Sequence, residues 1–216
     1  MTGSRDLVLR RIRAALGDVP AAASPADSPV ARDYLPAHVP ETPDTGLDLL
    51  AENLADYRAR VHRTTSRHLP SVVAELLAAR GSRSVAVPAD LPPAWLSEAE
   101  GVEQIPDSAG LTAARLDTVD SALTGCALAV AETGTVVLDA GPAQGRRALT
   151  LVPDHHICVI RADQVVASVP RALPLLDPRR PQTWISGPSA TSDIELSRVE
   201  GVHGPRTLDT VLVGPD

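Results

Sequence analysis

Residues 185–205 concentrate small hydroxyl residues, two carboxylates and a histidine in one short stretch of the chain. An apolar run, 183–185, ends at Ser186-Gly187-Pro188-Ser189, and His203 stands between two glycines, Gly201 and Gly204. Free backbone amides at the start of a helix bind phosphates and carboxylates. An exposed imidazole with a pKa near 6.5 suits proton transfer. The candidate ligand-binding residues of this stretch are Ser186, Gly187, Ser189, Thr191, Asp193, Glu195 and Gly204, with His203 as candidate proton carrier.

A second candidate block, Glu132-Thr133-Gly134-Thr135, follows a continuous apolar run over residues 126–131. A carboxylate at the mouth of a buried strand is partly desolvated and can act as nucleophile, base or hydrogen-bond acceptor. Gly134 permits a turn that other residues resist, and its amide can approach a ligand closely. We therefore treat Glu132 as a candidate catalytic residue, with 133–135 as ligand-binding residues.

Each of these features also has a purely structural interpretation. Glu132 can pair with an arginine or cap a turn, and the serines can simply begin a helix. His203 can hold loop backbone groups. Asp193 and Glu195 are two apart, so they share a face only on an extended backbone.

Two further polar motifs point less clearly to a site. His155 and His156 are adjacent, so on a strand they face opposite ways and make poor joint metal ligands. Residues 141–147 can hold an anion or form a turn leading into a solvated helix start. We expect no metal site in this chain.

Composition excludes several classes of function. The formal net charge of −7 argues against general nucleic-acid binding. All 20 basic residues are arginine, so Schiff-base and Walker lysines are excluded. The glycine spacing matches neither the dinucleotide fingerprint nor a P-loop, and there is no Gly-x-Ser-x-Gly elbow.

An iron–sulfur cluster usually needs four thiolates and a structural zinc a closely spaced pair, and the two cysteines, Cys126 and Cys158, provide neither. We interpret them as buried thiols in a reducing cytoplasm. No apolar run approaches the roughly 18–20 residues of a membrane span, and no secretory signal is evident. We therefore expect a cytoplasmic protein without a membrane span.

The chain is predicted to have an N-terminal helix on a proline-rich tether, 1–43, followed by one α/β domain, 44–216. In that domain, helices are expected over 47–57, 70–81 and 162–176, the last of which Pro170 and Pro174 must bend or end. Strands are expected over 60–63, 84–87, 126–131, 135–139, 156–160, 184–185 and 208–213. This alternation favours one mostly parallel sheet, at whose carboxyl edge ligands bind.

Three blocks in this order resemble the LUD-domain proteins, the lactate utilisation protein C family. The blocks are Thr-Gly-…-Ala-Glu-Thr-Gly-Thr over 124–135, Ile-Ser-Gly-Pro-Ser-x-Thr-x-Asp-Ile-Glu over 185–195, and Gly-Val-His-Gly-Pro over 201–205. They extend from about residue 120 to the C-terminus.

The resemblance implies a Rossmann-like fold of the sugar-phosphate isomerase and CoA-transferase superfamily. It also implies a cluster-free member, without a cofactor of its own, that works beside iron–sulfur partner proteins in the oxidation of L-lactate to pyruvate. By analogy with related CoA transferases, Glu132 is the candidate nucleophile. Many relatives have Arg where this chain has Ala190. If that Arg holds a substrate carboxylate, this chain uses another group, for which Arg206 is the candidate, or binds something else.

The leading hypothesis is a cytoplasmic accessory subunit of a lactate-oxidising system that binds a small carboxylate or phosphate. One alternative is a self-sufficient acyl- or CoA-transferase-like or sugar-phosphate enzyme that uses Glu132 and His203. Another is a non-catalytic interaction module, with residues 1–43 as its docking arm.

Overall fold

The computed structural model of the protein describes residues 4–17, 35–38, 43–191, 199–201 and 203–215. The chain divides into two compact units, residues 1–35 and 36–216. The first unit contains α1 (Ser4–Ala15), which buries none of its residues. No helix among the described residues has the length and apolar character needed to cross a membrane.

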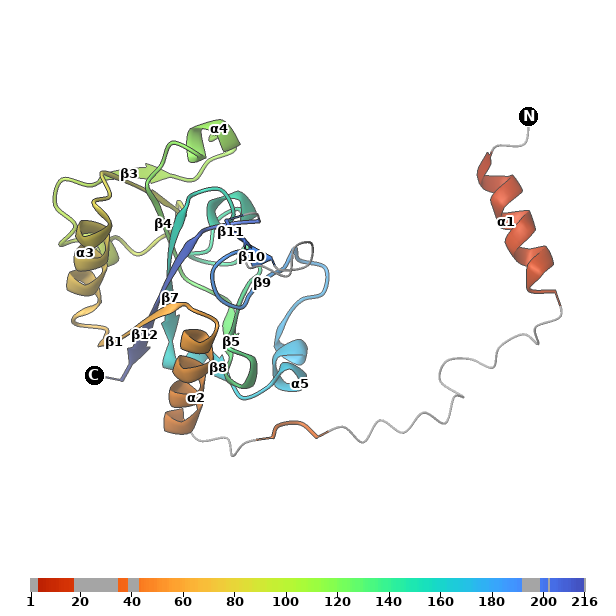
Figure 1. Ribbon diagram of the computed structural model, residues 1–216, viewed down its shortest axis with the longest axis horizontal. Helices are drawn as coiled ribbons and strands as arrows, with labels where there is room; N and C mark the ends of the chain where they lie inside the picture. The colour runs from red at the N-terminus through yellow and green to blue at the C-terminus, as the bar shows by residue number, and fades with distance from the viewer. Residues whose placement is uncertain (1–3, 18–34, 39–42, 192–198, 202, 216) are drawn as a thin grey trace. The chain divides into compact units, whose positions relative to one another are not determined.

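The second unit is built around a six-stranded sheet in which every pairing is parallel. Its central strands are buried along almost their whole length, because helices and a second sheet cover both faces (Figure 1). The prediction of an α/β fold with a mostly parallel sheet is therefore confirmed. In spatial order the strands are β1 (Arg60–Thr65), β12 (Thr207–Gly214), β7 (His155–Arg161), β4 (Ser121–Thr124), β2 (Ser84–Val87) and β3 (Glu103–Pro106).

A separate four-stranded sheet corrects the expectation of one sheet. Gly134 adopts φ +55° and reverses the chain, so that the strands on either side of it pair antiparallel as a hairpin. These two strands therefore cannot both join a parallel sheet. In spatial order this small sheet contains β8 (Val165–Val166), β5 (Leu128–Val130), β6 (Thr135–Leu138) and β9 (Thr183–Ile185).

The helix expected over 162–176 is also corrected. Val165 and Val166 form β8 instead, where β-branched side chains pack well. Pro170 and Pro174 sit in the first turns of two short helices, since proline lacks the N–H that a longer helix needs there. The segment therefore consists of η5 (Ala162–Gln164), β8, α5 (Val169–Ala172) and η6 (Leu173–Leu175).

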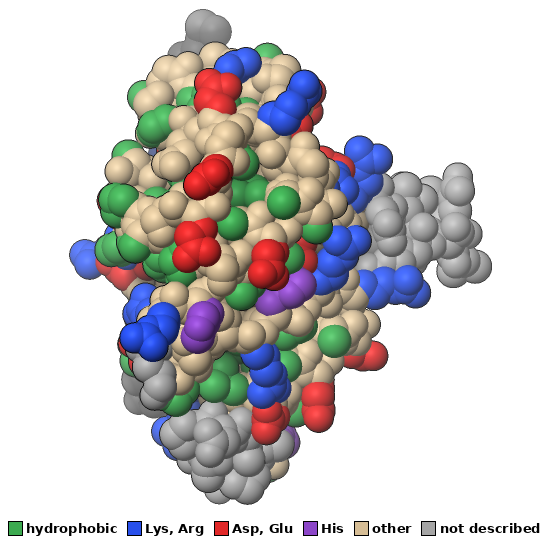
Figure 2. Space-filling model, turned by 90° about the vertical axis from the view of Figure 1, so that its left-hand side faces the viewer, with side chains coloured by type: hydrophobic (Ala, Val, Ile, Leu, Met, Phe, Trp, Pro, Cys, Tyr) green, Lys and Arg blue, Asp and Glu red, His purple; other side chains and the backbone are tan. Residues whose placement is uncertain are grey.

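Two longer helices cover the main sheet from opposite sides, as Figure 1 shows. Leu50 and Leu54 of α2 (Pro43–Asp56) share a core cluster with Ile160 and with the small sheet. Val73 of α3 (Leu69–Arg80) packs on the other face with Ile157. On the side that carries α3, acidic, basic and apolar side chains are interspersed (Figure 2). Successive residues of β7 therefore enter two different environments.

The remaining short elements connect these layers. They are η2 (Pro93–Leu96), α4 (Ala113–Leu116), η3 (Ala131–Thr133), η4 (Arg147–Thr150), β10 (Ala190–Thr191) and β11 (Val199–Glu200).

Candidate functional site

The structure brings the two predicted blocks together at one end of the small sheet. Val136 of β6 pairs with Ile185 of β9, which places Thr135 opposite Ser186. Their hydroxyl oxygens lie 2.8 Å apart, and Oγ1 of Thr133 lies 2.8 Å from Oγ1 of Thr135. A chain of hydroxyls therefore joins the Glu132–Thr135 turn to the end of β9.

Two glycines allow this end of the small sheet to lie directly against the end of α2. A Cβ atom on Gly134 would lie 2.7 Å from the carbonyl carbon of Asn53, and one on Gly187 would clash with the carbonyl oxygen of Tyr57. Both glycines have positive φ, +55° and +81°. Their role here is close backbone packing, which positions Ser186 and the residues after it.

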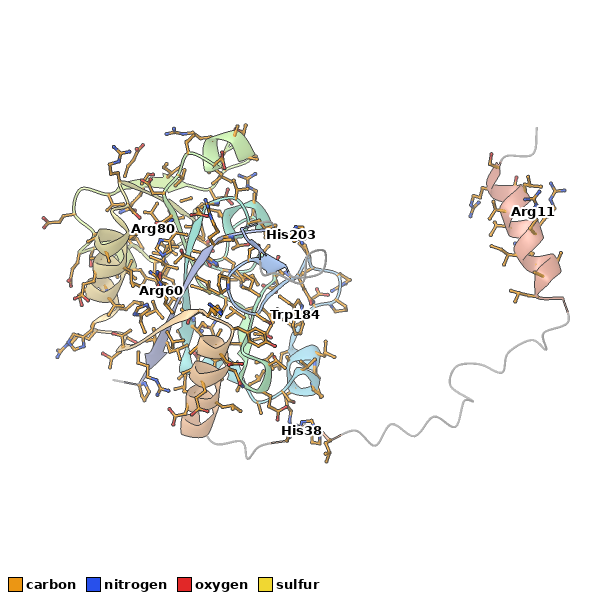
Figure 3. The ribbon with its side chains drawn as sticks, in the orientation of Figure 1. Arg11, His38, Arg60, Arg80, Trp184 and His203 are labelled. Atoms are coloured by element: carbon orange, nitrogen blue, oxygen red, sulfur yellow. The ribbon has the colours of Figure 1, made fainter. Side chains whose placement is uncertain are left out.

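Glu132 lies on η3, where its backbone N–H donates to the carbonyl of Ala167 over 2.9 Å. Its carboxylate accepts a hydrogen bond from the backbone N–H of His38 and lies 3.2 Å from Nδ1 of the same residue. Figure 3 shows His38 well apart from His203. The structure therefore does not bring the Glu132 carboxylate to His203, the histidine that the enzyme hypothesis pairs with it.

Ser189 joins the other two blocks. Its Oγ accepts from the backbone N–H of His203 over 2.9 Å, and its own N–H donates to the carbonyl of Pro205 over 2.8 Å. The N–H of Gly201 donates to the carbonyl of Ser189 over 2.9 Å. These bonds hold the glycine-flanked loop against the end of β9, with His203 exposed above it.

A cavity of about 370 Å³ lies between the main sheet, η4, β9 and this loop. That volume is within the range of small-molecule sites. Trp184, on its wall, and His203 lie on the same side of the main sheet (Figure 3). The expected site residues that line it are Ser186, Gly187, Ser189, His203 and Gly204; its other polar or aromatic lining residues include Arg147, Thr150, His156 and Trp184.

His156 lies at the inner wall of the cavity and is 1% exposed. Its Nε2 lies 2.8 Å from Oγ1 of Thr124, whereas Nδ1 has no hydrogen-bond partner. Burial, assisted by the neighbouring His155, lowers the pKa of His156 to about 3. The imidazole is therefore neutral at pH 7 and adds no positive charge to the cavity.

Arg147 supplies the positive charge at this cavity. It begins η4 and is exposed, and its guanidinium has no ion-pair partner in the part of the chain that the structure describes. A planar guanidinium with free N–H groups suits a carboxylate or phosphate. The sequence signal was the motif at residues 141–147, for which both an anion site and a solvated turn were considered.

Arg206 is engaged elsewhere. Its Nε lies 2.6 Å from Oδ1 of Asp154, whose other oxygen lies 2.8 Å from Nη2 of Arg80. Burial acts to raise the pKa of Asp154, but the hydrogen bond and charge of Arg206 outweigh it and lower that pKa. Arg206 lines a neighbouring polar cavity of about 680 Å³, which shares His203 and Gly204 with the first.

Three expected site residues receive little or no structural description. Asp193 and Glu195 lie outside the described residues, and Thr191 is described only as the end of β10. Within the described ranges, no three His, Cys, Asp or Glu side chains are grouped so that they could hold a metal ion.

A second polar cluster lies on the α3 face of the main sheet. Asp209 bridges two histidines, with Oδ1 2.7 Å from Nε2 of His62 and Oδ2 2.8 Å from Nε2 of His155. Nδ1 of His155 lies 2.7 Å from Oγ of Ser121. This Ser-His-Asp order resembles a hydrolase triad, but Ser121 is completely buried, so its hydroxyl cannot reach a substrate. The cluster is therefore a structural network.

Comparisons with a family profile and with individual proteins point to the same family. The LUD domain profile matches residues 47–213. The chain is 47% identical over 167 residues to a lactate utilization protein C of Deinococcus radiodurans, which covers 76% of this chain and 77% of the relative. It is 29% identical over 172 residues to the lactate utilization protein C of Geobacillus thermodenitrificans, covering 69% and 70% of the two chains.

A solved structure is also similar. The crystal structure of a DUF162 family protein from Deinococcus radiodurans superimposes with a TM-score of 0.69 at 37% sequence identity. The match covers 81% of this chain and all of the crystallised chain. The two proteins are therefore similar in sequence as well as in fold.

Proposed function

Because the chain belongs to the LUD-domain family, we propose that it serves in L-lactate utilisation by binding a small carboxylate or phosphate ligand in the cavity beside Arg147. The observation that carries the proposal is the guanidinium of Arg147, which has no ion-pair partner among the described residues, at a cavity walled by the hydroxyl residues Ser186 and Ser189. A cation with free donors and nearby hydroxyls is the usual protein environment for a small anion.

The neighbouring groups support an anionic ligand rather than a cation. No carboxylate lines the cavity among the described residues, so nothing there competes for the guanidinium. His203 adds an exposed imidazole at the same wall. Its ring nitrogens can hydrogen-bond the oxygen atoms of such a ligand. Trp184 supplies an apolar surface for the carbon atoms of the ligand.

We further propose that the chain works with partners that carry iron–sulfur clusters. Oxidation of lactate to pyruvate removes two electrons and two protons, and the electrons need an acceptor. Clusters are usually held by four cysteine thiolates, whereas this chain has two cysteines, both buried. Their unpaired state also supports a cytoplasmic location, where thiols remain reduced.

Growth of the host bacterium tests this role. Deletion of the gene should abolish or slow growth on L-lactate and leave growth on pyruvate unchanged. The wild-type gene should restore growth, and Arg147→Gln should not. Arg179→Gln is the matched control, because Arg179 is an exposed arginine paired locally with Asp177. Undiminished growth of the deletion strain on L-lactate would contradict the proposal.

A further inference from the structure

The connections of the main sheet leave in opposite directions between β2 and β4. From β2 the chain runs to β3 on one side, whereas from β4 it runs by way of the small sheet to β7 on the other. β2 and β4 are parallel neighbours, with Val85 opposite Ser121 and Ala86 opposite Ala122. In open α/β sheets, ligands bind in the crevice outside the carboxyl ends of two such strands. The topology therefore points to one place on this sheet.

A cavity of about 570 Å³ lies at this place. Its lining includes Asp90, which follows β2, and Gly125, which follows β4. The cavity beside Arg147 is a different one, because His156 and Leu208 on its wall lie where β7 and β12 begin. A volume of about 570 Å³ is within the range of small-molecule sites. Topology and cavity therefore agree on a second candidate site, at the carboxyl edge of the sheet.

A strained loop forms a polar part of the lining. It spans residues 139–145 after β6, and its Ala140 and Ala143 have φ of +58° and +57°. Residues with a Cβ rarely adopt this left-handed conformation, which is concentrated at functional sites. A Cβ atom on Gly141 would lie 2.8 Å from Oδ1 of Asp139, so the loop is also closed tightly on itself. Such a loop holds its polar groups in fixed positions.

Arg180 is held against this loop. Its Nη1 lies 2.6 Å from Oδ2 of the buried Asp139. The other oxygen of that carboxylate accepts from the N–H of Gly141 and from Nε2 of Gln144, each over 3.0 Å. The Arg180 side chain is 45% exposed, and among the described residues its guanidinium has no second hydrogen-bond partner. Its remaining N–H groups are therefore positioned to bind an acceptor.

The other polar groups of the lining are mostly engaged already. Asp163 pairs with Arg161, and Asp90 accepts from the N–H of Ala143 over 3.0 Å. Nε2 of Gln164 donates to the carbonyl of Cys126 over 2.6 Å. The groups left for a ligand are therefore mainly guanidinium N–H donors, which suit an acceptor that carries negative charge.

Apolar side chains complete the lining, among them Trp95, Leu128 and Leu176. Trp95 is half-buried, so part of its ring remains accessible. Indole and leucine side chains favour contact with aliphatic or aromatic carbon atoms of a ligand. The cavity thus combines an apolar surface with one fixed cation.

From this arrangement we infer that the crevice at the ends of β2 and β4 binds an amphipathic anion, whose carboxylate or phosphate contacts Arg180 and whose apolar body lies on Trp95 and Leu176. This site is separate from the cavity beside Arg147 and goes beyond the proposed function.

Calorimetric titration of the full chain compares anions with and without an apolar body. Octanoate and adenosine 5′-monophosphate carry an aliphatic and an aromatic body, whereas acetate and inorganic phosphate are the corresponding small anions. We expect at least one larger probe to bind about tenfold more tightly than its small counterpart. Arg180→Gln should weaken that probe about tenfold, and Arg179→Gln, which changes an exposed arginine paired with Asp177, is the matched control. Equal affinities of large and small anions, or no binding of either larger probe, would overturn the inference.

Arg147→Gln separates this site from the cavity of the proposed function. It should leave the affinity for the larger probe within about twofold, because Arg147 does not line the crevice. Loss of that binding in Arg147→Gln but not in Arg180→Gln would place the probe in the other cavity and refute the inference, while leaving the proposed function intact.

Tryptophan fluorescence covers the case in which Arg180→Gln fails to fold. The chain has two tryptophans, so Trp184→Phe leaves Trp95 as the only one. In that variant, the larger probe that binds should change the emission of Trp95, and acetate and phosphate should not. An emission spectrum that does not respond to a probe shown by calorimetry to bind would mean that the probe lies elsewhere, and the inference would be wrong.

Discussion

Nε2 of His155 lies 2.8 Å from Oδ2 of Asp209, and both side chains are at most 3% exposed. The same carboxylate also receives His62, which is 31% exposed. Burial acts to raise the pKa of Asp209, but hydrogen bonds from His155 and His62 outweigh it and hold that pKa well below its usual range. One buried charge therefore links three parallel strands, β1, β12 and β7, at their amino ends.

Asp209→Asn should lower the free energy of unfolding by about 2–4 kcal/mol, because hydrogen bonds to a buried charge are replaced by weaker neutral ones. Urea denaturation followed by circular dichroism at pH 7 measures the change. Asp163→Asn is the matched control, since Asp163 is 71% exposed and its pair with Arg161 lies at the surface. A loss for Asp209→Asn no larger than that of the control would contradict a structural role for the network.

The sequence predicted those helices and strands whose ends are marked by residues at the ends themselves. Pro70 and Gly81 bound α3 within one residue of the expected range, because proline suits a first turn and Gly81 adopts φ +71° at the C-cap. β2 matches its predicted bounds, 84–87. Which strands pair with one another in a sheet could not be predicted in the same way. The apolar run before Glu132 is typical of a buried parallel strand, and only the pairing around Gly134 assigns it to a separate sheet.

The candidate site was likewise predictable from the sequence only in part. The glycine and hydroxyl pattern predicted a ligand site that includes Ser186, Gly187, Ser189, His203 and Gly204. The structure places these residues at one cavity. Alternation along a strand correctly predicted that His155 and His156 face opposite ways. It could not show that one histidine faces Asp209 and the other a cavity, because those neighbours come from distant parts of the chain. For the same reason, the sequence could not show that Glu132 contacts His38.

Gly187→Ala should be strongly destabilising, by about 3 kcal/mol or more, because a Cβ there meets the backbone of Tyr57 in addition to the strain of positive φ. Gly81→Ala isolates the strain alone, since Gly81 has φ +71° and no atom within 4 Å of the added Cβ. We expect about 1 kcal/mol for this control. Urea denaturation of both variants measures the loss in the free energy of unfolding. Equal losses in the two variants would show that the close packing at Gly187 contributes nothing to stability.

Protonation of His156 should weaken the fold in mild acid. The pKa of His156 is lowered to about 3, whereas an unfolded histidine has a pKa near 6.5. Between these values the unfolded chain binds a proton that the folded chain does not, so stability falls as pH falls through this window. The slope for one such group approaches about 1.4 kcal/mol per pH unit.

Denaturant unfolding of the wild type and His156→Leu at pH 7 and pH 5 checks this expectation. The wild type should lose about 1–2 kcal/mol more than the variant between the two pH values, because leucine takes up no proton. The comparison cancels the other titrating groups, which both chains share. Parallel pH dependences would mean that His156 is protonated in the folded state.

Glu132→Gln should leave ligand affinity in the cavity within about twofold. The Glu132 carboxylate contacts His38 rather than the cavity, and it is 15% exposed. Calorimetric titration with L-lactate and with pyruvate measures the effect, with exposed Glu98→Gln as the control. A complete loss of binding or of turnover in Glu132→Gln would instead favour the acyl-transfer-type enzyme, in which this carboxylate is the nucleophile.

Removal of residues 1–35 should leave the stability and ligand affinity of the remaining chain unchanged. The helix α1 buries no residue, so its loss should alter the free energy of unfolding by less than about 0.5 kcal/mol. Leu7, Val8 and Ile12 of α1 are each 44–54% exposed, as suits a surface that docks on a partner. Serine at these three positions in the full chain should therefore impair growth on L-lactate while leaving calorimetric binding intact. Normal growth of both the truncated and the triple-serine strains would remove the interaction-arm hypothesis, and a loss of ligand affinity on truncation would mean that the first 35 residues belong to the binding unit.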